Sequence, residues 1–182
     1  KIYYEIGKII FKKKLPLYKV LDVGFGNGSF INYLYSEYGQ KKNINITGIE
    51  PDNFLFKNAK KNLPRKIKIH KIGLFSKKTY QFKNQFDYVI CMGVINLFDD
   101  LRITIKKLKS FINLNNKNSK IIIFSKMNPY DVDVISRYKF SDEKEYKIGQ
   151  NLFSIKTLKR ISKETNLSYN IKNFEIDFNI RK

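Results

Sequence analysis

The 182-residue chain has one cysteine, one histidine, no tryptophan and no long apolar run. A single cysteine excludes an internal disulfide framework and a cysteine-rich zinc site, and it suits a reducing compartment. No stretch approaches the roughly 20 apolar residues of a membrane span, and no secretory signal is visible near the N-terminus. We therefore expect a cytoplasmic protein with no membrane span and no metal site. Because the first residue is Lys1 rather than Met, we also expect residues upstream of it.

Acidic residues are also scarce, with 16 Asp and Glu against 36 Lys and Arg and a net charge of +20. Such a surplus is one signature of a nucleic-acid partner. Lysine is nevertheless spread along nearly the whole chain, and Asn, Ile, Phe and Tyr are also frequent, which favours a coding bias and solvated lysine faces. Arginine, the better bidentate ligand for phosphate, occurs only at Arg65, Arg102, Arg137, Arg160 and Arg181. We therefore rank nucleic acid below a small molecule as the expected partner.

The apolar pattern alternates between short buried runs and helical spacing. At this length about 70% of the unfolded surface can be buried, so residues 1–182 are expected to form one domain. Strands separated by helices predict an α/β fold with a mainly parallel central sheet and helices on both faces. Ligands of such sheets bind beyond the carboxyl ends of the strands. The expected strands are 19–24, 44–50, 67–69, 86–91, 121–124 and 174–180, and the expected helices are 1–14, 29–38, 52–63, 101–112 and 154–167.

A glycine-rich loop follows the first expected strand, with glycines at Gly24, Gly26 and Gly28. Alternate glycines let the backbone turn sharply and approach a ligand closely, although Gly26 or Gly28 could serve only the packing of strand against helix. The dinucleotide fingerprint requires a third glycine where this chain has Ser29. The loop is also preceded by Asp22, whose carboxylate would repel a pyrophosphate but attract a sulfonium or ammonium group. These residues argue against NAD and for a cationic ligand.

A second acid, Glu50, closes the second expected strand 22 residues after Gly28. An acid at this position can accept both ribose hydroxyls of an adenosine. The alternative is a solvated end of the strand. The upstream loop and Asp22 favour the ribose interpretation.

Three segments in this order, 20–28, 49–51 and 86–95, resemble the first, second and fourth motifs of class I S-adenosylmethionine-dependent methyltransferases. The resemblance runs from about Val20 to Phe124 and implies a Rossmann-like fold with S-adenosylmethionine as cofactor and S-adenosylhomocysteine (SAH) as product. It places Asp22, Gly24, Gly26 and Gly28 at the methionine and sulfonium end of the cofactor, Glu50 at its ribose and Pro51 at its adenine. By the same resemblance Gly73, Leu74 and Phe75 face the adenine, and Met92 and Gly93 close the site.

The chain departs from that family in three places. No acid follows the third expected strand, where Gly73 and Leu74 stand. The tract 95–98 has no histidine, so no imidazole base is expected there and no catalytic residue is assigned. Asp99 and Asp100 could act as a base, but we expect them to cap the following helix, and we expect His70 to be a surface residue away from the ligand. The family's final antiparallel strand has no candidate before Lys182.

Residues 127–153 form an expected insertion on the substrate side of the domain, where such segments usually select the acceptor. The tripeptide 128–130 superficially resembles the motif of methyltransferases acting on DNA bases, but it lacks the second proline and comes one strand too late. Segments 128–133, 136–138 and 174–177 are more similar to methyltransferases of polysaccharide synthesis. That similarity implies a sugar or another small polar acceptor, with Tyr130, Asp131, Asp133 and Arg137 as contacts, unless the loop is only capped and solvated.

The leading hypothesis is therefore a methyltransferase acting on a small molecule or glycan. RNA or DNA as acceptor is the alternative that the positive charge supports. A methyltransferase-like binding module without catalysis is the third.

Overall fold

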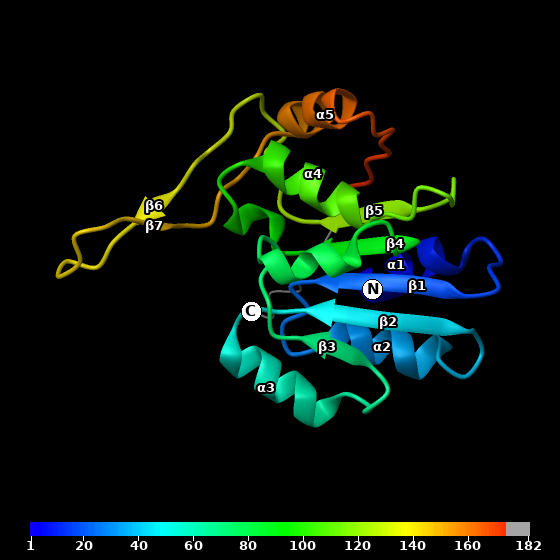
Figure 1. Cartoon of the computed structure of the whole chain (residues 1–182). Coiled ribbons are helices and arrows are strands. Elements are labelled where there is room, and N and C mark those ends of the chain that lie inside the picture. Colours follow the sequence, from blue (N-terminus) through cyan, green and yellow to red (C-terminus); the bar gives the residue numbers. More distant parts are fainter. Residues whose placement is uncertain (174–182) are drawn as a thin grey trace, which may run out of the picture.

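The computed structural model describes residues 1–173 of the chain. Its centre is a five-stranded parallel sheet with the strand order β3-β2-β1-β4-β5 (Figure 1). The expected strand at 174–180 lies outside the described residues. The strands are β1 (Tyr18–Val23), β2 (Ile44–Ile49), β3 (Lys68–His70), β4 (Tyr88–Met92), β5 (Lys120–Phe124), β6 (Arg137–Tyr138) and β7 (Lys147–Ile148). The helices are α1 (Ile2–Phe11), α2 (Ser29–Tyr38), α3 (Asn53–Asn62), α4 (Leu101–Phe111) and α5 (Ile155–Glu164), with short 3-10 helices η1 (Lys77–Phe82) and η2 (Ile95–Leu97).

Each face of the sheet is covered by its own apolar core. On one face Val20 of β1 packs with buried side chains of α1, α2 and α3, such as Ile10 and Leu34. On the other face Leu21 packs with α4, α5 and η1, including Leu108. Successive side chains of a strand point to opposite faces, so a strand buried on both sides must be apolar almost throughout. The expected α/β arrangement with helices on both faces is confirmed.

Side-chain caps begin three of the helices where the sequence predicts them. The Asp52 carboxylate accepts a hydrogen bond from the Leu55 amide at 2.8 Å, and Asp100 accepts one from Ile103 at 2.8 Å. The Ser154 hydroxyl accepts one from the Thr157 amide at 3.0 Å. These caps satisfy amide groups that have no partner within the helix, so they fix where α3, α4 and α5 begin.

The strand order places a topological switch point between β1 and β4. From β1 the chain winds outward through β2 to β3, and it then returns to the other side of β1 to form β4 and β5. The loops after β1 and β4 therefore leave the sheet in opposite directions, which opens a ligand position at the carboxyl ends of these two strands.

The segment between β5 and α5 does not join the sheet. Strands β6 and β7 pair as an antiparallel hairpin, and Figure 1 shows this hairpin in an arm that projects from the carboxyl side of the sheet. Most of its side chains are exposed. Among residues 1–173, no helix is long and apolar enough to cross a membrane.

Two isoleucines of α4 test the packing of the second core. Ile105 is 2% exposed and belongs to that core, whereas Ile103 on the same helix is 55% exposed. We expect Ile105→Ala to lower the free energy of unfolding by about 2 to 5 kcal/mol, because it removes buried methyl groups and leaves a cavity. Ile103→Ala should change it by less than about 0.5 kcal/mol. Urea denaturation of both variants measures the difference, and equal losses would contradict this packing.

Candidate functional site

The glycine loop after β1 turns through left-handed backbone conformations. Gly24, Gly26 and Gly28 have φ angles of +71°, +59° and +84°, which side chains other than glycine rarely adopt. Two roles are expected for these glycines, close approach to a ligand or packing of strand against helix, and the structure indicates a different role for Gly26 and Gly28. A Cβ atom at Gly28 would lie 2.9 Å from the Leu63 side chain, whereas a Cβ at Gly26 would have nothing within 4 Å. Gly28 therefore serves packing against α3, and Gly26 presents bare backbone to open space.

Asp22 lies near the carboxyl end of β1, the central strand of the sheet, two residues before Gly24. It pairs with Gly48 of β2 and Ile90 of β4, and it is 1% exposed. Within the described residues neither of its carboxylate oxygens has a hydrogen-bond partner. Burial, together with the charge of Glu50, raises the pKa of Asp22 from 3.8 to about 7. A buried carboxylate without partners is costly, so this position favours a nearby positive charge.

Glu50 holds the glycine loop against the end of β2. Its Oε2 atom accepts a hydrogen bond from the Gly26 amide at 3.0 Å, and its Oε1 atom accepts one from the Asp52 amide at 2.9 Å. The side chain is 6% exposed. Since each carboxylate oxygen can accept more than one hydrogen bond, Glu50 keeps acceptor capacity beyond the two amides.

Contacts between neighbouring loops bring the other predicted cofactor residues to the same end of the sheet. A Cβ at Gly73 would lie 3.6 Å from the Pro51 side chain, so the loops after β2 and β3 touch. The Phe75 and Phe98 rings meet edge to face at 5.3 Å, which joins the loops after β3 and β4. Leu74 is buried nearby.

The end of β4 lies beside the glycine loop. A Cβ at Gly24 would collide with the Val94 side chain, so the loops after β1 and β4 are in contact. Met92 is partly buried at the end of β4, and Gly93 has a φ angle of +69° with open space where its Cβ would stand. The structure thus gathers the predicted cofactor residues at one edge, and their roles remain predictions.

His70 is not where the sequence analysis expects it. As the last residue of β3 it lies at the carboxyl edge of the sheet, and its carbonyl accepts a hydrogen bond from the Glu50 amide at 3.1 Å. Its ring packs edge to face on Phe82 at 5.2 Å. Burial, helped by the charge of Lys68, lowers the pKa of His70. The expectation that His70 lies away from the carboxyl edge is wrong, because His70 ends β3 beside Glu50, and its side chain is half-buried.

Three of the four predicted acceptor contacts are engaged within the chain. Asp133 accepts hydrogen bonds from the Ser154 amide at 2.6 Å and the Thr157 hydroxyl at 2.8 Å. Burial opposes ionisation of Asp133, but these hydrogen bonds outweigh it and hold its pKa below the usual value. The Asp131 carboxylate pairs with Lys156 at 2.7 Å. This part of the arm therefore helps to begin α5, and a role toward an acceptor remains a prediction.

Arg137 and Asp99 form an ion pair at 2.9 Å that holds the arm to the loop after β4. Asp99 also accepts a hydrogen bond from the Asn151 amide at 3.3 Å, so it does not cap α4 as Asp100 does. Tyr130 is 76% exposed. Beneath the base of the arm lies a cavity of about 300 Å³, lined by Asp99 and Asp133 among others.

The sequence analysis did not identify a buried pair of asparagines, Asn96 and Asn151, at the same edge. The Asn96 side chain donates a hydrogen bond to the Asn151 carbonyl at 2.6 Å and accepts one from the Ser125 hydroxyl. The Asn151 side chain in turn donates to the Phe98 carbonyl at 2.9 Å. This pair fixes the loop after β4 to the segment that ends the arm. Asparagine is frequent in this chain, so nothing in the sequence marks these two residues.

The surroundings of Cys91 exclude it as a nucleophile, and the described residues form no metal site. Burial, together with the charge of Asp22, raises the pKa of the Cys91 thiol to about 12, so the lone cysteine is not a thiolate near neutral pH. Across residues 1–173, no group of three or more His, Cys, Asp or Glu side chains could hold a metal ion.

The pH dependence of stability tests the environment of Asp22. A carboxyl group whose pKa is raised by folding destabilises the folded state as pH rises from its unfolded pKa to its folded pKa. For Asp22 this window runs from about pH 4 to about pH 7, and three pKa units correspond to at most about 4 kcal/mol. The free energy of unfolding of Asp22→Asn, relative to wild type, should therefore rise across this window and level off above it. Urea denaturation at pH 4.5, 6 and 8 measures it, and a constant difference would contradict the assignment.

Three solved structures with a similar fold are methyltransferases. A carbon methyltransferase named CurJ superposes over 96% of this chain and 48% of its own length, with a TM-score of 0.69 and 13% identity. An S-adenosylmethionine-dependent methyltransferase from Listeria monocytogenes, described as putative, superposes over 90% of this chain and 82% of its own, with a TM-score of 0.62 and 11% identity. The plantazolicin methyltransferase BpumL in complex with SAH matches 67% of this chain and 43% of its own, with a TM-score of 0.52 and 20% identity. These similarities show the Rossmann-like methyltransferase fold.

Sequence comparison gives the same family. A curated relative, a probable (S)-tetrahydroprotoberberine N-methyltransferase from Papaver bracteatum, is 28% identical over 97 residues, which are 51% of this chain. The matched region spans about a quarter of that relative, 25% of its length. The family model described as a methyltransferase domain matches residues 5–170, which include every strand of the central sheet and the residues Asp22, Gly26 and Glu50. The chain therefore belongs to the methyltransferase-domain family.

Proposed function

We propose that this chain is an enzyme that transfers a methyl group from S-adenosylmethionine to a small organic acceptor. The observation that carries the proposal is Asp22, a fully buried carboxylate without a hydrogen-bond partner in the described residues, at the carboxyl end of β1 and beside the glycine loop. A cationic ligand at this edge would stabilise its ionised form, because opposite charges attract strongly where water is excluded.

The residues at this edge fit the cofactor by its chemical parts. The open backbone at Gly26 admits the methionine part without a side-chain clash. Glu50, whose oxygens keep acceptor capacity, would hold the ribose hydroxyls, as acids at the end of β2 do in Rossmann-like folds. Pro51, Gly73 and Leu74 would contact the adenine, and Met92 and Gly93 would border the site from β4. When bound, S-adenosylmethionine supplies an electrophilic methyl group on its sulfonium.

The chain itself would contribute positioning more than acid or base catalysis. The loop after β4 carries Asn96 in place of an imidazole, and both of its side-chain amide interactions are structural. Asp99 is paired with Arg137. Holding two reacting groups in line can supply about 7 to 11 kcal/mol of the barrier, so an acceptor that is nucleophilic without a strong base suits this site. A nitrogen acceptor meets that condition, whereas a hydroxyl would gain from a base.

Three large apolar side chains are exposed at the carboxyl edge, among charged neighbours such as Asp52 and Lys71. Phe54, Phe75 and Leu97 are 71%, 48% and 52% exposed, and exposed apolar side chains that gather at one edge are typical of binding sites. This supports a small organic acceptor, as does the similarity to the relative from Papaver bracteatum, a probable N-methyltransferase. A sugar acceptor bound through Asp131, Asp133, Tyr130 or Arg137 is the alternative that the arm supports. An acceptor screen with radiolabelled methyl donor separates these two acceptor classes. Binding of S-adenosylmethionine without methyl transfer to any acceptor in the screen would contradict the proposal that the chain is an enzyme.

Cofactor selection depends on the charge of Asp22. We expect Asp22→Asn to weaken binding of S-adenosylmethionine at least tenfold and to weaken binding of SAH less, because only the former carries the sulfonium charge. Isothermal titration calorimetry with both ligands measures this, with NAD as a ligand that should not bind. The matched control is Asp87→Asn, another buried acid, which lies before β4 at the opposite end of the sheet. Equal losses for both cofactor forms, or for both variants, would contradict the role of Asp22.

Gly26 tests the open backbone of the loop. We expect Gly26→Ala to weaken binding of S-adenosylmethionine at least tenfold, because its Cβ would occupy the open space in front of the loop, and to lower the free energy of unfolding by about 1 kcal/mol through its left-handed conformation. Asn84→Ala is the control, since Asn84 has a similar φ of +57° and precedes β4 at the other end of the sheet. It should lose stability but keep its affinity. Unchanged affinity in Gly26→Ala would contradict cofactor binding at this loop.

A further inference from the structure

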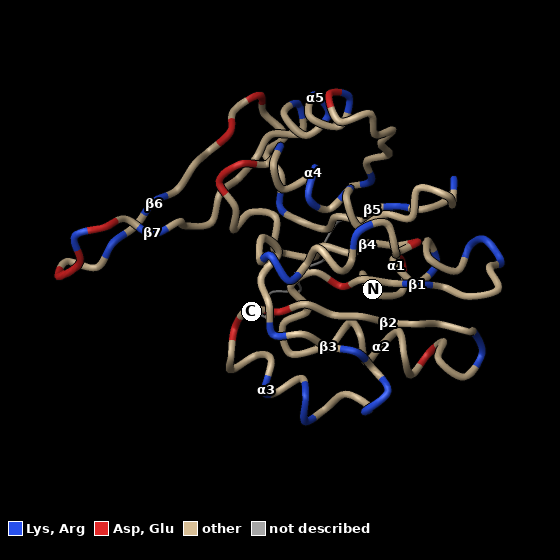
Figure 2. The backbone as a smooth tube through the Cα atoms, viewed as in Figure 1, with Lys and Arg blue, Asp and Glu red and all other residues tan. Residues whose placement is uncertain are grey.

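The positive charge of the chain is not evenly distributed about the sheet. The connections that lead into the strands, at the amino edge, are rich in lysine, as Figure 2 shows for β1, β2, β3 and β5. They contain one acid, Asp87, whose carboxylate is buried and accepts hydrogen bonds from the Lys19 amide and from Asn116. The basic residues of this edge are Lys12, Lys13, Lys14, Lys19, Lys41, Lys42, Arg65, Lys66, Lys68, Lys83, Lys117 and Lys120.

The carboxyl edge carries mixed charge instead. Its loops hold Glu50, Asp52, Asp99 and Asp100, and the arm alternates acids with bases. A coding bias toward lysine would coat both edges alike. The difference between the two edges therefore indicates a surface that is electropositive on one side only, which is the expected footprint of an anionic partner.

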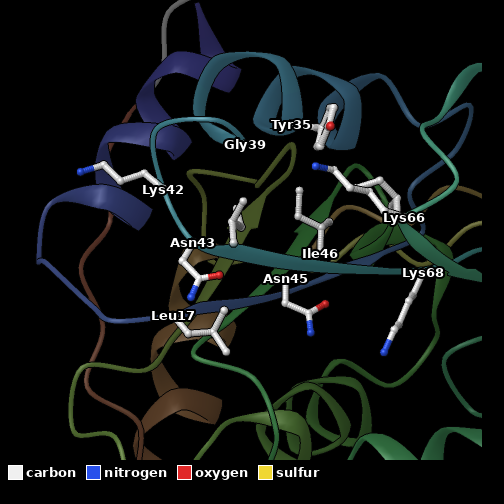
Figure 3. Close-up of a pocket in the computed structure, with 11 residues that line it drawn as sticks. Leu17, Tyr35, Gly39, Lys42, Asn43, Asn45, Ile46, Lys66 and Lys68 are labelled. Atoms are coloured by element: carbon white, nitrogen blue, oxygen red, sulfur yellow. The ribbon is translucent and has the colours of Figure 1, made fainter.

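A cavity of about 380 Å³ opens within this basic edge, beside the first residues of β2 (Figure 3). Lys42 and Lys66 line it from two connections and Lys68 from the start of β3, and Asn43 and Asn45 add amide groups. The Lys66 ammonium lies 4.5 Å from the centre of the Tyr35 ring, which fixes one charge at its rim. No carboxylate lines the cavity. Its volume falls within the roughly 300 to 1,000 Å³ of small-ligand sites, large enough for one nucleotide unit.

The chemistry of the edge suits phosphate groups in water. Lysine ammonium groups bind phosphate as point charges, and asparagine side chains can hydrogen-bond sugar and phosphate oxygens. A lipid surface would require exposed apolar side chains as well. In the described connections of this edge, Leu114 alone is a large hydrophobic residue with high exposure. The surface therefore fits a chain of phosphates better than a membrane.

We propose that the amino edge of the sheet, centred on the cavity of Lys42, Lys66 and Lys68, binds a single nucleic-acid strand through its phosphate backbone. This site lies at the end of the sheet opposite Asp22 and the glycine loop, so a nucleotide unit bound in it is a docking contact and not the methyl acceptor. The concave site favours a flexible single strand, one unit of which can enter it. RNA and DNA share the phosphodiester that the lysines would recognise.

Charge reversal at the cavity tests the proposal without any cofactor. Lys42, Lys66 and Lys68 are exposed, so the triple variant K42E/K66E/K68E should keep the thermal unfolding midpoint of wild type. We expect it to bind fluorescein-labelled 20-mers of single-stranded RNA and DNA at least tenfold more weakly in fluorescence anisotropy at 50 mM salt. Log affinity against log salt has a slope of about −0.7 per neutralised phosphate for single strands. The magnitude of the slope should therefore fall by about 2.

A second triple variant separates a localised site from net charge. Lys106, Lys144 and Lys159 are exposed on α4, the arm and α5, and K106E/K144E/K159E lowers the net charge by the same amount. It should bind both 20-mers as wild type does. Equal loss in the two triple variants, no binding by the wild type at 50 mM salt, or binding to anionic phosphatidylserine vesicles without binding to either 20-mer would overturn the proposal. Because none of these measurements involves S-adenosylmethionine, their failure leaves the methyl-transfer proposal to its own tests.

Discussion

The burial of Asp22 in the middle of a parallel sheet is the constraint on which the site depends. Every neighbour of this carboxylate along β2 and β4 is apolar or glycine at the paired positions, Gly48 and Ile90. Burial and the charge of Glu50 disfavour the ionised form and raise the pKa of Asp22 to about 7. A group placed this way is poorly stabilised by the protein alone and well stabilised by a cation, because low local polarity strengthens both effects. The sheet thus holds an acid whose ionised form depends on what binds beside it.

Glu50 shows how the same acids can hold the loop and the ligand. Its hydrogen bonds to the Gly26 and Asp52 amides fix the turn of the glycine loop and the start of α3 before any ligand arrives. Its charge also raises the pKa of Asp22, so the two carboxylates repel each other across the loop. A ligand that offers hydroxyls to one and a positive charge to the other relieves both interactions. S-adenosylmethionine carries its sulfonium directly beside the adenosine ribose, whereas NAD carries a negatively charged pyrophosphate at that place.

The sequence predicted the core elements well because local and tertiary signals agreed there. Asp52, Asp100 and Ser154 are caps in the sequence and in the structure, and the apolar runs of β1 and β4 can only be central strands. The expected cofactor residues lie at the carboxyl ends of the strands and in the loops that follow, so their gathering at one edge follows from the topology. Errors arose where a short element carries little signal. The three residues of β3 were placed one position early, and His70, which was expected away from the carboxyl edge, ends this strand.

The sequence could not predict contacts between residues that lie far apart in the chain. The bonds of Asn96 with Asn151, of Asp133 with Ser154 and of Arg137 with Asp99 join segments with no periodic pattern between them. The distribution of lysine is a similar case. Along the chain it looks uniform, but a parallel sheet sorts its connections into two sets, those before and those after each strand, and the lysines concentrate in the first set. Such sorting places basic residues at one edge, so a carboxyl edge of mixed charge and a basic amino edge coexist in one small domain.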